Sequence, residues 1–156
     1  QYHELNGSWF WWGGKNCTPK EVVELWKYIV SYLRDTKQIH QLLYAFNTDR
    51  FSSEKEYVER YPGNDWVDIV GFDIYQNGDI LANDKFIAEM DKSLSLLDKI
   101  AKEKNKMTAL TEFGYKTVPD VDWWTTVFLK AIEKHSIAYE LAWRNAGRKS
   151  ANEMEY

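Results

Sequence analysis

The chain has 156 residues, is 28% charged and 44% hydrophobic, and carries a formal net charge of −4. This length fits one domain, and the negative charge gives no reason to expect a nucleic-acid partner, because proteins that bind nucleic acids are basic. No apolar run approaches the ~18 residues of a membrane-spanning helix, and the single cysteine, Cys17, excludes a disulfide within the chain.

The first third of the chain predicts two helices and two strands. Residues 1–3 are long enough only for the end of a strand. Thr18, Pro19 and Glu21 form a capping-box pattern with proline in the first turn, so a helix begins there and continues to about residue 34. A short apolar strand is expected over 40–46, and a short helix over 53–60.

The rest of the chain continues the alternation of strands and helices. The clearest strand covers 67–75. A helix, a strand, a second helix and a last strand follow it. We expect strands over 67–75, 106–112 and 137–143, helices over 84–104 and 122–135, and a polar loop over 145–156.

This alternation predicts an α/β fold with a parallel sheet. An open doubly wound sheet would be favoured by a glycine-rich phosphate loop, which the sequence lacks. Glu4, Tyr75, Glu112 and Trp143 instead fall at the carboxyl ends of different strands, where (β/α)8 TIM barrels carry their chemistry. Five strands amount to about five-eighths of such a barrel, so we expect the segment to belong to a larger polypeptide or to be completed by a partner chain.

The stretch His3-Glu4-Leu5-Asn6-Gly7 is not a zinc motif. The metalloprotease pattern needs a second histidine four residues after the first, where this chain has Gly7. The other potential ligands, Cys17, His40 and His135, are far from His3 in sequence. We therefore expect no metal and no cofactor.

Two glutamates suit hydrolysis of a glycosidic bond. Glu4 and Glu112 each end a predicted strand and are followed by glycine within three residues. Either one alone is better explained as a solvated loop carboxylate, but the pair, with aromatic neighbours, favours catalysis. Glu4 would act as general acid and then base, and Glu112 as nucleophile.

Aromatic and polar residues accompany this pair. Asp73 and Tyr75 alternate along their strand and so point to the same side, where the Tyr75 hydroxyl can donate to the Glu112 carboxylate. The alternative for Tyr75 is a packing residue with a satisfied hydroxyl. Trp143 offers a platform for a sugar ring, and Arg144 a cation for its hydroxyls.

The segments 3–13, 73–75, 111–114 and 143–144 together resemble glycoside hydrolase family 26, chiefly β-mannanases. The resemblance covers essentially the whole chain and aligns it with the fourth to eighth strands of that barrel. It implies that Glu4 is the acid/base, that Glu112 is the nucleophile, and that His3 and Tyr75 assist them. The residues expected to contact substrate are Trp9, Asp73, Trp143 and Arg144.

The resulting hypothesis is a retaining endo-β-1,4-mannanase, with residues 1–156 forming the carboxyl-terminal portion of its catalytic domain. The expected partners are a β-mannan or related plant polysaccharide and the amino-terminal part of the same barrel. The resemblance implies an extracellular, periplasmic or cell-surface location. The alternatives are a β-glucanase or xylanase of the same family and a non-catalytic glycan-binding protein.

Overall fold

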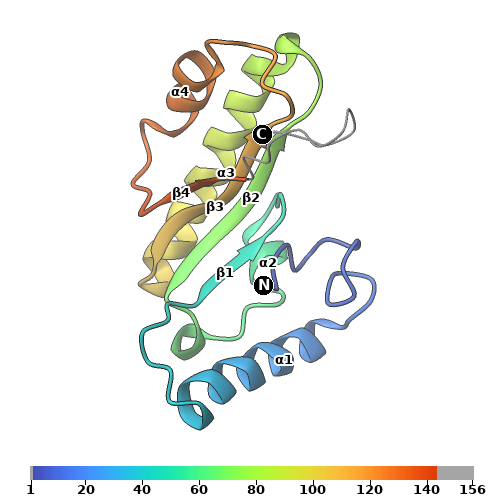
Figure 1. Ribbon diagram of the computed structural model, residues 1–156, viewed down its shortest axis with the longest axis vertical. Coiled ribbons are helices and arrows are strands. Elements are labelled where there is room, and N and C mark those ends of the chain that lie inside the picture. Colours follow the sequence, from blue (N-terminus) through green and yellow to red (C-terminus); the bar gives the residue numbers. More distant parts are fainter. Residues whose placement is uncertain (1, 144–156) are drawn as a thin grey trace.

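Four parallel strands form the centre of the structure, in the spatial order β1-β2-β3-β4. The computed structural model describes residues 2–143, and Figure 1 shows the sheet running through it. The strands are β1 (Ala45–Thr48), β2 (Ile69–Gln76), β3 (Met107–Tyr115) and β4 (Glu140–Ala142). The parallel order confirms the predicted α/β class.

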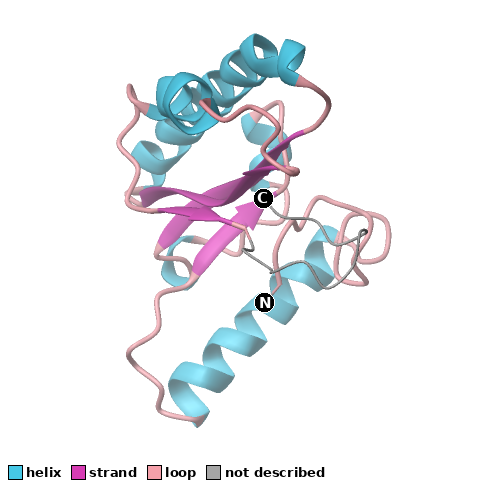
Figure 2. Ribbon diagram, turned by 45° about the horizontal axis from the view of Figure 1, so that its top comes forward, coloured by secondary structure: helices cyan, strands magenta, loops and turns pink. Residues whose placement is uncertain are grey.

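The helices lie on two sides of this sheet. The long helix α3 (Asn83–Lys104) packs against β2 and β3, and α4 (Leu129–Ile132) packs against α3. Figure 2 shows both on the same face of the sheet, whereas α1 (Pro19–Ser31) lies well apart from them. The short α2 (Glu54–Val58) follows β1. Among the described residues, no helix combines the length and apolarity needed to cross a membrane.

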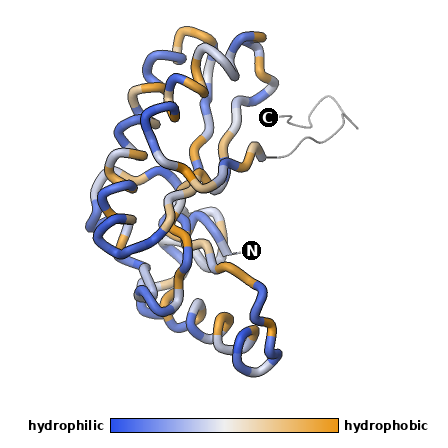
Figure 3. Tube along the Cα trace, turned by 90° about the vertical axis from the view of Figure 1, so that its left-hand side faces the viewer, coloured by the Kyte–Doolittle hydropathy of each residue, from blue (hydrophilic) through white to orange (hydrophobic). Residues whose placement is uncertain are grey.

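Helix α1 begins where the sequence predicts it. The Thr18 hydroxyl accepts a hydrogen bond from the Glu21 amide, and the Glu21 carboxylate accepts one from the Thr18 amide, which completes the capping box. The helix is amphipathic: Val22 and Val30 are buried, and Tyr28 is exposed. Figure 3 shows this as hydrophobic and hydrophilic residues alternating along the turns of α1. A π-helical segment, Tyr32–Thr36, ends it.

Two strand predictions near the start of the chain were wrong in their bounds. The strand expected over 40–46 is β1, which begins only at Ala45, because its partner β2 begins at the paired residue Ile69. The apolar residues before it, such as Leu43, are exposed. Residues 2 and 3 are not in a strand, and a long 3.5 Å hydrogen bond joins the Leu5 amide to the Asn47 carbonyl of β1.

The second half of the fold also departs in detail from the prediction. β3 extends three residues beyond the predicted end at 112, to Tyr115. The helix expected over 122–135 begins as a π-helical segment, Trp124–Phe128, and continues as α4. The last strand is shortened to β4, and the loop expected over 145–156 lies outside the described residues.

Aromatic packing and one histidine join α4 to the rest of the fold. Phe113 of β3 stacks on Phe128 with ring centroids 4.0 Å apart, beside the fully buried Trp123. The His135 ring lies 2.8 Å from the Asp98 carboxylate and 3.1 Å from that of Asp91, both on α3. These contacts fix the segment that follows the carboxyl end of β3.

The structure also has apolar surface that no described residue covers. Within residues 2–143, β1 and β4 are each paired on one side only. An apolar groove lies between α1 and the sheet, lined mainly by Trp26, Ile29, Val30, Leu33, Leu43 and Leu141. An unpaired parallel edge beside apolar surface favours association with other chains.

We therefore expect the isolated 156-residue polypeptide to self-associate. Light scattering coupled to size exclusion should show species larger than the monomer, and calorimetry should show no single cooperative unfolding transition. A monodisperse monomer that melts cooperatively would contradict this expectation.

Candidate active site

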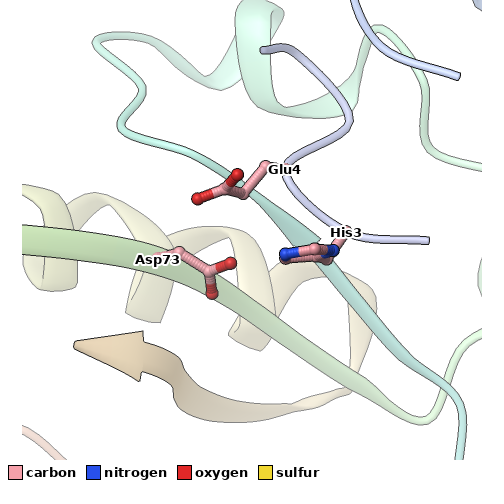
Figure 4. A group of neighbouring side chains, drawn as sticks. All are labelled: His3, Glu4 and Asp73. Carbon is pink, nitrogen blue, oxygen red and sulfur yellow. The ribbon is translucent and has the colours of Figure 1, made fainter. Parts of the chain in front are cut away.

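The loop that follows His3 turns sharply at Glu4. Glu4 has a positive φ of 49°, a backbone conformation that non-glycine residues rarely adopt and that costs energy to maintain. A hydrogen bond of 2.8 Å from the Gly7 amide to the Glu4 carbonyl closes the turn. The turn therefore directs the Glu4 side chain toward the carboxyl ends of the strands (Figure 4).

Gly7 lets the Trp9 ring reach the Glu4 carboxylate. A Cβ atom at Gly7 would lie 2.4 Å from the Trp9 ring, so no larger residue fits there without displacing the indole. The Trp9 Nε1–H donates to Glu4 Oε2 over 2.5 Å. Gly7, which the sequence predicts in a turn, therefore also leaves the space that the Trp9 indole needs to bind Glu4.

Asn6 and Arg50 connect this loop to the strands. The Asn6 side chain accepts a hydrogen bond from the Asp49 amide at 2.8 Å and donates one to the Arg50 carbonyl at 3.0 Å. The Arg50 guanidinium in turn donates to the Tyr75 carbonyl and pairs with Glu89 of α3 at 2.9 Å. The position of Glu4 is therefore coupled to the end of β2.

The ring-rich segment after Glu4 packs largely on itself. Phe10 and Trp12 stack with centroids 4.4 Å apart, and Phe10 also lies against the His3 ring at 4.9 Å. The Trp12 indole donates to the His3 carbonyl over 2.9 Å. These rings hold His3, whereas Trp9 remains 58% exposed.

A β-bulge brings Glu112 to the site. Phe72 pairs with Leu110, but the next residue, Asp73, pairs with Glu112, so Thr111 is the extra residue of β3. In a regular strand Thr111 and Glu112 would point to opposite faces. Here both reach the same cluster, because the bulge breaks that alternation.

Glu112 is held by two of the predicted residues. The Tyr75 hydroxyl donates to Glu112 Oε2 over 2.7 Å, as the sequence predicts, and His3 Nε2 lies 3.8 Å from Glu112 Oε1. Only 3% of Glu112 is exposed. The Tyr75 hydroxyl, a neutral donor, orients this buried side chain.

Burial sets the protonation states around this carboxylate. It raises the pKa of Glu4, an effect that the Trp9 hydrogen bond opposes and the Asp49 and Glu112 charges reinforce. Burial also lowers the pKa of His3, which favours its neutral form despite the nearby Glu112. The pKa of Tyr75 is raised by burial and by its bond to Glu112, so the phenol stays a donor.

Asp73, on the strand that also carries Tyr75, is 0% exposed. Its Oδ1 accepts hydrogen bonds from Thr111 Oγ1 at 2.7 Å and Asn47 Nδ2 at 2.8 Å. The expectation that Asp73 binds the sugar directly has no support in this geometry, because the side chain presents no surface to a ligand.

Asp73 also belongs to a group with His3 and Glu4. One ring nitrogen of His3 and one carboxylate oxygen of each acid lie within 4.8 Å of one another, and Figure 4 shows the three side chains converging. Such a donor set can share a proton or take a divalent cation. The sequence did not reveal this group, because Asp73 lies 69 residues after Glu4 along the chain.

The last predicted residues lie at the end of β4. Trp143 is 37% exposed, and its amide donates to the Phe113 carbonyl over 2.9 Å. Arg144 lies outside the described residues. The structure thus gathers His3, Glu4, Tyr75 and Glu112 in one cluster, and it adds Asn47 and Thr111, which the sequence analysis missed.

Comparison with known proteins identifies the family. The model of glycosyl hydrolase family 26 matches residues 1–153. The chain belongs to this family. It is 36% identical, over 99% of its own length, to a mannan endo-1,4-beta-mannosidase of Bifidobacterium adolescentis, and 30% identical over 96% to one of Bacillus subtilis strain 168.

Solved structures of the family agree. A family 26 beta-mannanase from Bacteroides ovatus is 39% identical over 92% of this chain, with a TM-score of 0.86. The catalytic domain of a Bacillus sp. JAMB-750 endo-beta-1,4-mannanase of the same family is 35% identical over 98%, with a TM-score of 0.84. The likeness confirms the predicted fold class, a partial (β/α)8 barrel.

The family 26 chain is shorter than these relatives. It spans 17% and 39% of the lengths of the two curated mannosidases, and 41% and 42% of the two solved structures.

The effect of the Trp9 indole on the pKa of Glu4 can be tested by substitution. Trp9→Phe keeps an aromatic ring but removes the N–H that favours the ionised carboxylate, so the pKa of Glu4 should rise further. NMR titration of protein labelled at the glutamate carboxyl carbons would measure it. The matched control is Trp11→Phe, an exposed ring on the same loop. Equal titration curves for Glu4 in Trp9→Phe and the parent would contradict the assigned role.

Proposed function

We propose that these residues form the catalytic part of a retaining endo-β-1,4-mannanase. The observation that carries the proposal is the difference between the two glutamates. The Tyr75 hydroxyl and the neighbouring His3 orient Glu112, whereas burial raises the pKa of Glu4. One carboxylate suited to attack and one carboxylic acid suited to protonation are what a double displacement requires.

In the first step Glu112 is the nucleophile. A carboxylate oxygen of Glu112 attacks the anomeric carbon, the bond to the glycosidic oxygen breaks, and Glu4 gives its proton to that oxygen. A covalent glycosyl-enzyme results, and Glu4 is left ionised. The Trp9 N–H, 2.5 Å from Glu4 Oε2, stabilises this charged form.

In the second step Glu4 acts as the base. It removes a proton from water as the water oxygen attacks the anomeric carbon, and the bond to Glu112 breaks. Glu4 regains its proton and Glu112 its charge. The Tyr75 hydroxyl stays bonded to Glu112 and can stabilise the departing carboxylate.

Exposed tryptophans provide surfaces for the sugar rings. Trp9, on the loop after Glu4, and Trp143, at the end of β4, are both exposed. Flat aromatic faces pack against the apolar C–H faces of pyranoses. We assign these rings, with Arg144, to the sugar subsites. The names of the relatives, mannan endo-1,4-beta-mannosidases, favour a β-mannan as the substrate.

We infer that residues 1–156 act as the carboxyl-terminal portion of one catalytic domain. The family 26 structures that they resemble are more than twice as long, and the apolar groove beside α1 is suited to cover by further barrel units. The proposed partner is thus the amino-terminal part of the same barrel. A polymeric substrate favours a secreted, periplasmic or surface-anchored enzyme.

Hydrolysis assays test this function and its alternatives. A protein that contains the complete barrel should release reducing sugar from mannan and glucomannan faster than from lichenan or xylan. Glu112→Gln should lower kcat by roughly 10⁴-fold or more, because it removes the nucleophile. The matched control is Glu103→Gln, at the exposed end of α3, which should leave kcat unchanged.

Two outcomes would overturn the proposal. Faster release from lichenan or xylan would indicate a glucanase or xylanase. No release from any polysaccharide, with mannan affinity equal in the parent and Glu112→Gln, would indicate a glycan-binding protein.

A further inference from the structure

Two buried polar atoms of the cluster lack hydrogen-bond partners among the described residues. They are Oδ2 of Asp73 and Nδ1 of His3. Asp73 is fully buried, and its other oxygen, Oδ1, already accepts from both Asn47 and Thr111. All the donors that the structure supplies to this carboxyl therefore converge on one oxygen.

This asymmetry fits a neutral carboxylic acid better than a carboxylate. A buried ionised carboxylate needs donors for both oxygens, and an orphaned charged oxygen is costly. In the neutral acid, Oδ1 is a carbonyl oxygen that can accept two bonds, and Oδ2 carries a hydroxyl hydrogen that needs an acceptor. His3 and Glu4 each have an atom within 4.8 Å of an Asp73 oxygen, but no His3 ring nitrogen is hydrogen-bonded to Oδ2, which leaves the Glu4 carboxyl as the acceptor.

The charged groups around Asp73 point the same way. Glu112 on β3 and Glu4 on the first loop both disfavour its ionisation, and His3, whose pKa is lowered, supplies little positive charge. The hydroxyls of Tyr57 and Tyr139 are also close enough to interact with it electrostatically. Burial and these carboxylates raise the pKa of Asp73 to about 8, against the hydrogen bonds from Thr111 and Asn47.

We propose that Asp73 is a positioning residue that works as a neutral acid, its single Oδ2 hydroxyl donating to the Glu4 carboxyl and holding Glu4 beside Glu112. The proposal rests on the proposed function for its catalytic consequence. With Asp73 neutral, the site carries one negative charge fewer beside Glu4 and Glu112. Ionisation of Asp73 would add that charge and remove the donor that orients Glu4.

The first test compares Asp73→Asn with Asp73→Ala in a protein that contains the complete barrel. Asparagine keeps an acceptor for Asn47 and Thr111 and puts an N–H donor at the place of the Oδ2 hydroxyl. We expect kcat/KM of Asp73→Asn to stay within about tenfold of the parent at pH 5–6, and Asp73→Ala to lose about 100-fold or more. A loss in Asp73→Asn as large as that in Asp73→Ala would show that the charge is required and would overturn the proposal.

The pH dependence gives a sharper version of this test. Above about pH 8 the parent should lose kcat in part because Asp73 ionises, whereas Asp73→Asn has nothing to ionise at this position. The alkaline limb of kcat should therefore move to higher pH in Asp73→Asn. The matched control is Asp68→Asn, one residue before β2, where the carboxylate accepts from the Tyr44 amide outside the cluster. An unmoved alkaline limb, or an equal movement in Asp68→Asn, would contradict the proposal.

Stability against pH tests the protonation state without any activity. Between pH ~4 and ~8 the folded protein would keep a proton on Asp73 that the unfolded chain loses, so this group's contribution to stability falls as pH rises. In a protein that contains the complete barrel, the melting temperature of Asp73→Asn should therefore rise relative to that of the parent between pH 5 and 8. Parallel melting curves across this range would refute the neutral acid even if the protein hydrolyses no polysaccharide.

A second variant covers the case in which Asp73→Asn does not fold. Thr111→Val is nearly isosteric and removes a donor that favours the ionised form, so the pKa of Asp73 should rise. The decline in stability with pH should then continue to a higher pH than in the parent. No extension of that decline would count against the proposal. If the parent is inactive but Asp73→Asn and Thr111→Val both change stability against pH as expected, the proposed function is wrong and the assignment of Asp73 as a neutral acid still holds.

Discussion

Three carboxyl groups share one buried site, and the cost of burying their charges together is the constraint on which the rest of the site depends. Glu4, Asp73 and Glu112 are each less than a tenth exposed. Each is supplied with a different donor: an indole for Glu4, a phenol for Glu112, and an amide with a hydroxyl for one oxygen of Asp73. The strained turn at Glu4 and the bulge at Thr111 position the carboxyl groups next to these donors. The two backbone irregularities are therefore part of the site.

Most of the fold could be predicted from the sequence, because apolar periodicity and helix caps are local signals. The capping box at Thr18 and the apolar run of β2 identified their elements closely. The start of β1 could not be predicted, since it depends on where β2 begins to pair, and the apolar residues before it are exposed. The strand predicted at the start of the chain was wrong for residues 2 and 3, which are not in a strand.

The candidate site could be predicted in part, for a similar reason. The contact of Tyr75 with Glu112 was predicted from the alternation of β2, and their hydrogen bond confirms it. Glu4 was expected at the carboxyl end of a strand, but residues 2 and 3 are not in a strand, and Glu112 lies three residues before the end of β3. Thr111 was missed because strand alternation points it away from Glu112, and only the bulge reverses this. The role of Asn47 depends on the pairing of β1 with β2, which no sequence spacing reveals.

The stereochemistry of the first product tests the central claim most directly, because it reports on the roles of both glutamates. If Glu112 forms a covalent intermediate and Glu4 then activates water, two inversions restore the original configuration at the anomeric carbon. Proton NMR of a β-mannan digest, recorded before mutarotation by a protein that contains the complete barrel, should show the β-anomer first. An initial α-anomer would contradict the assignment of Glu112 as nucleophile.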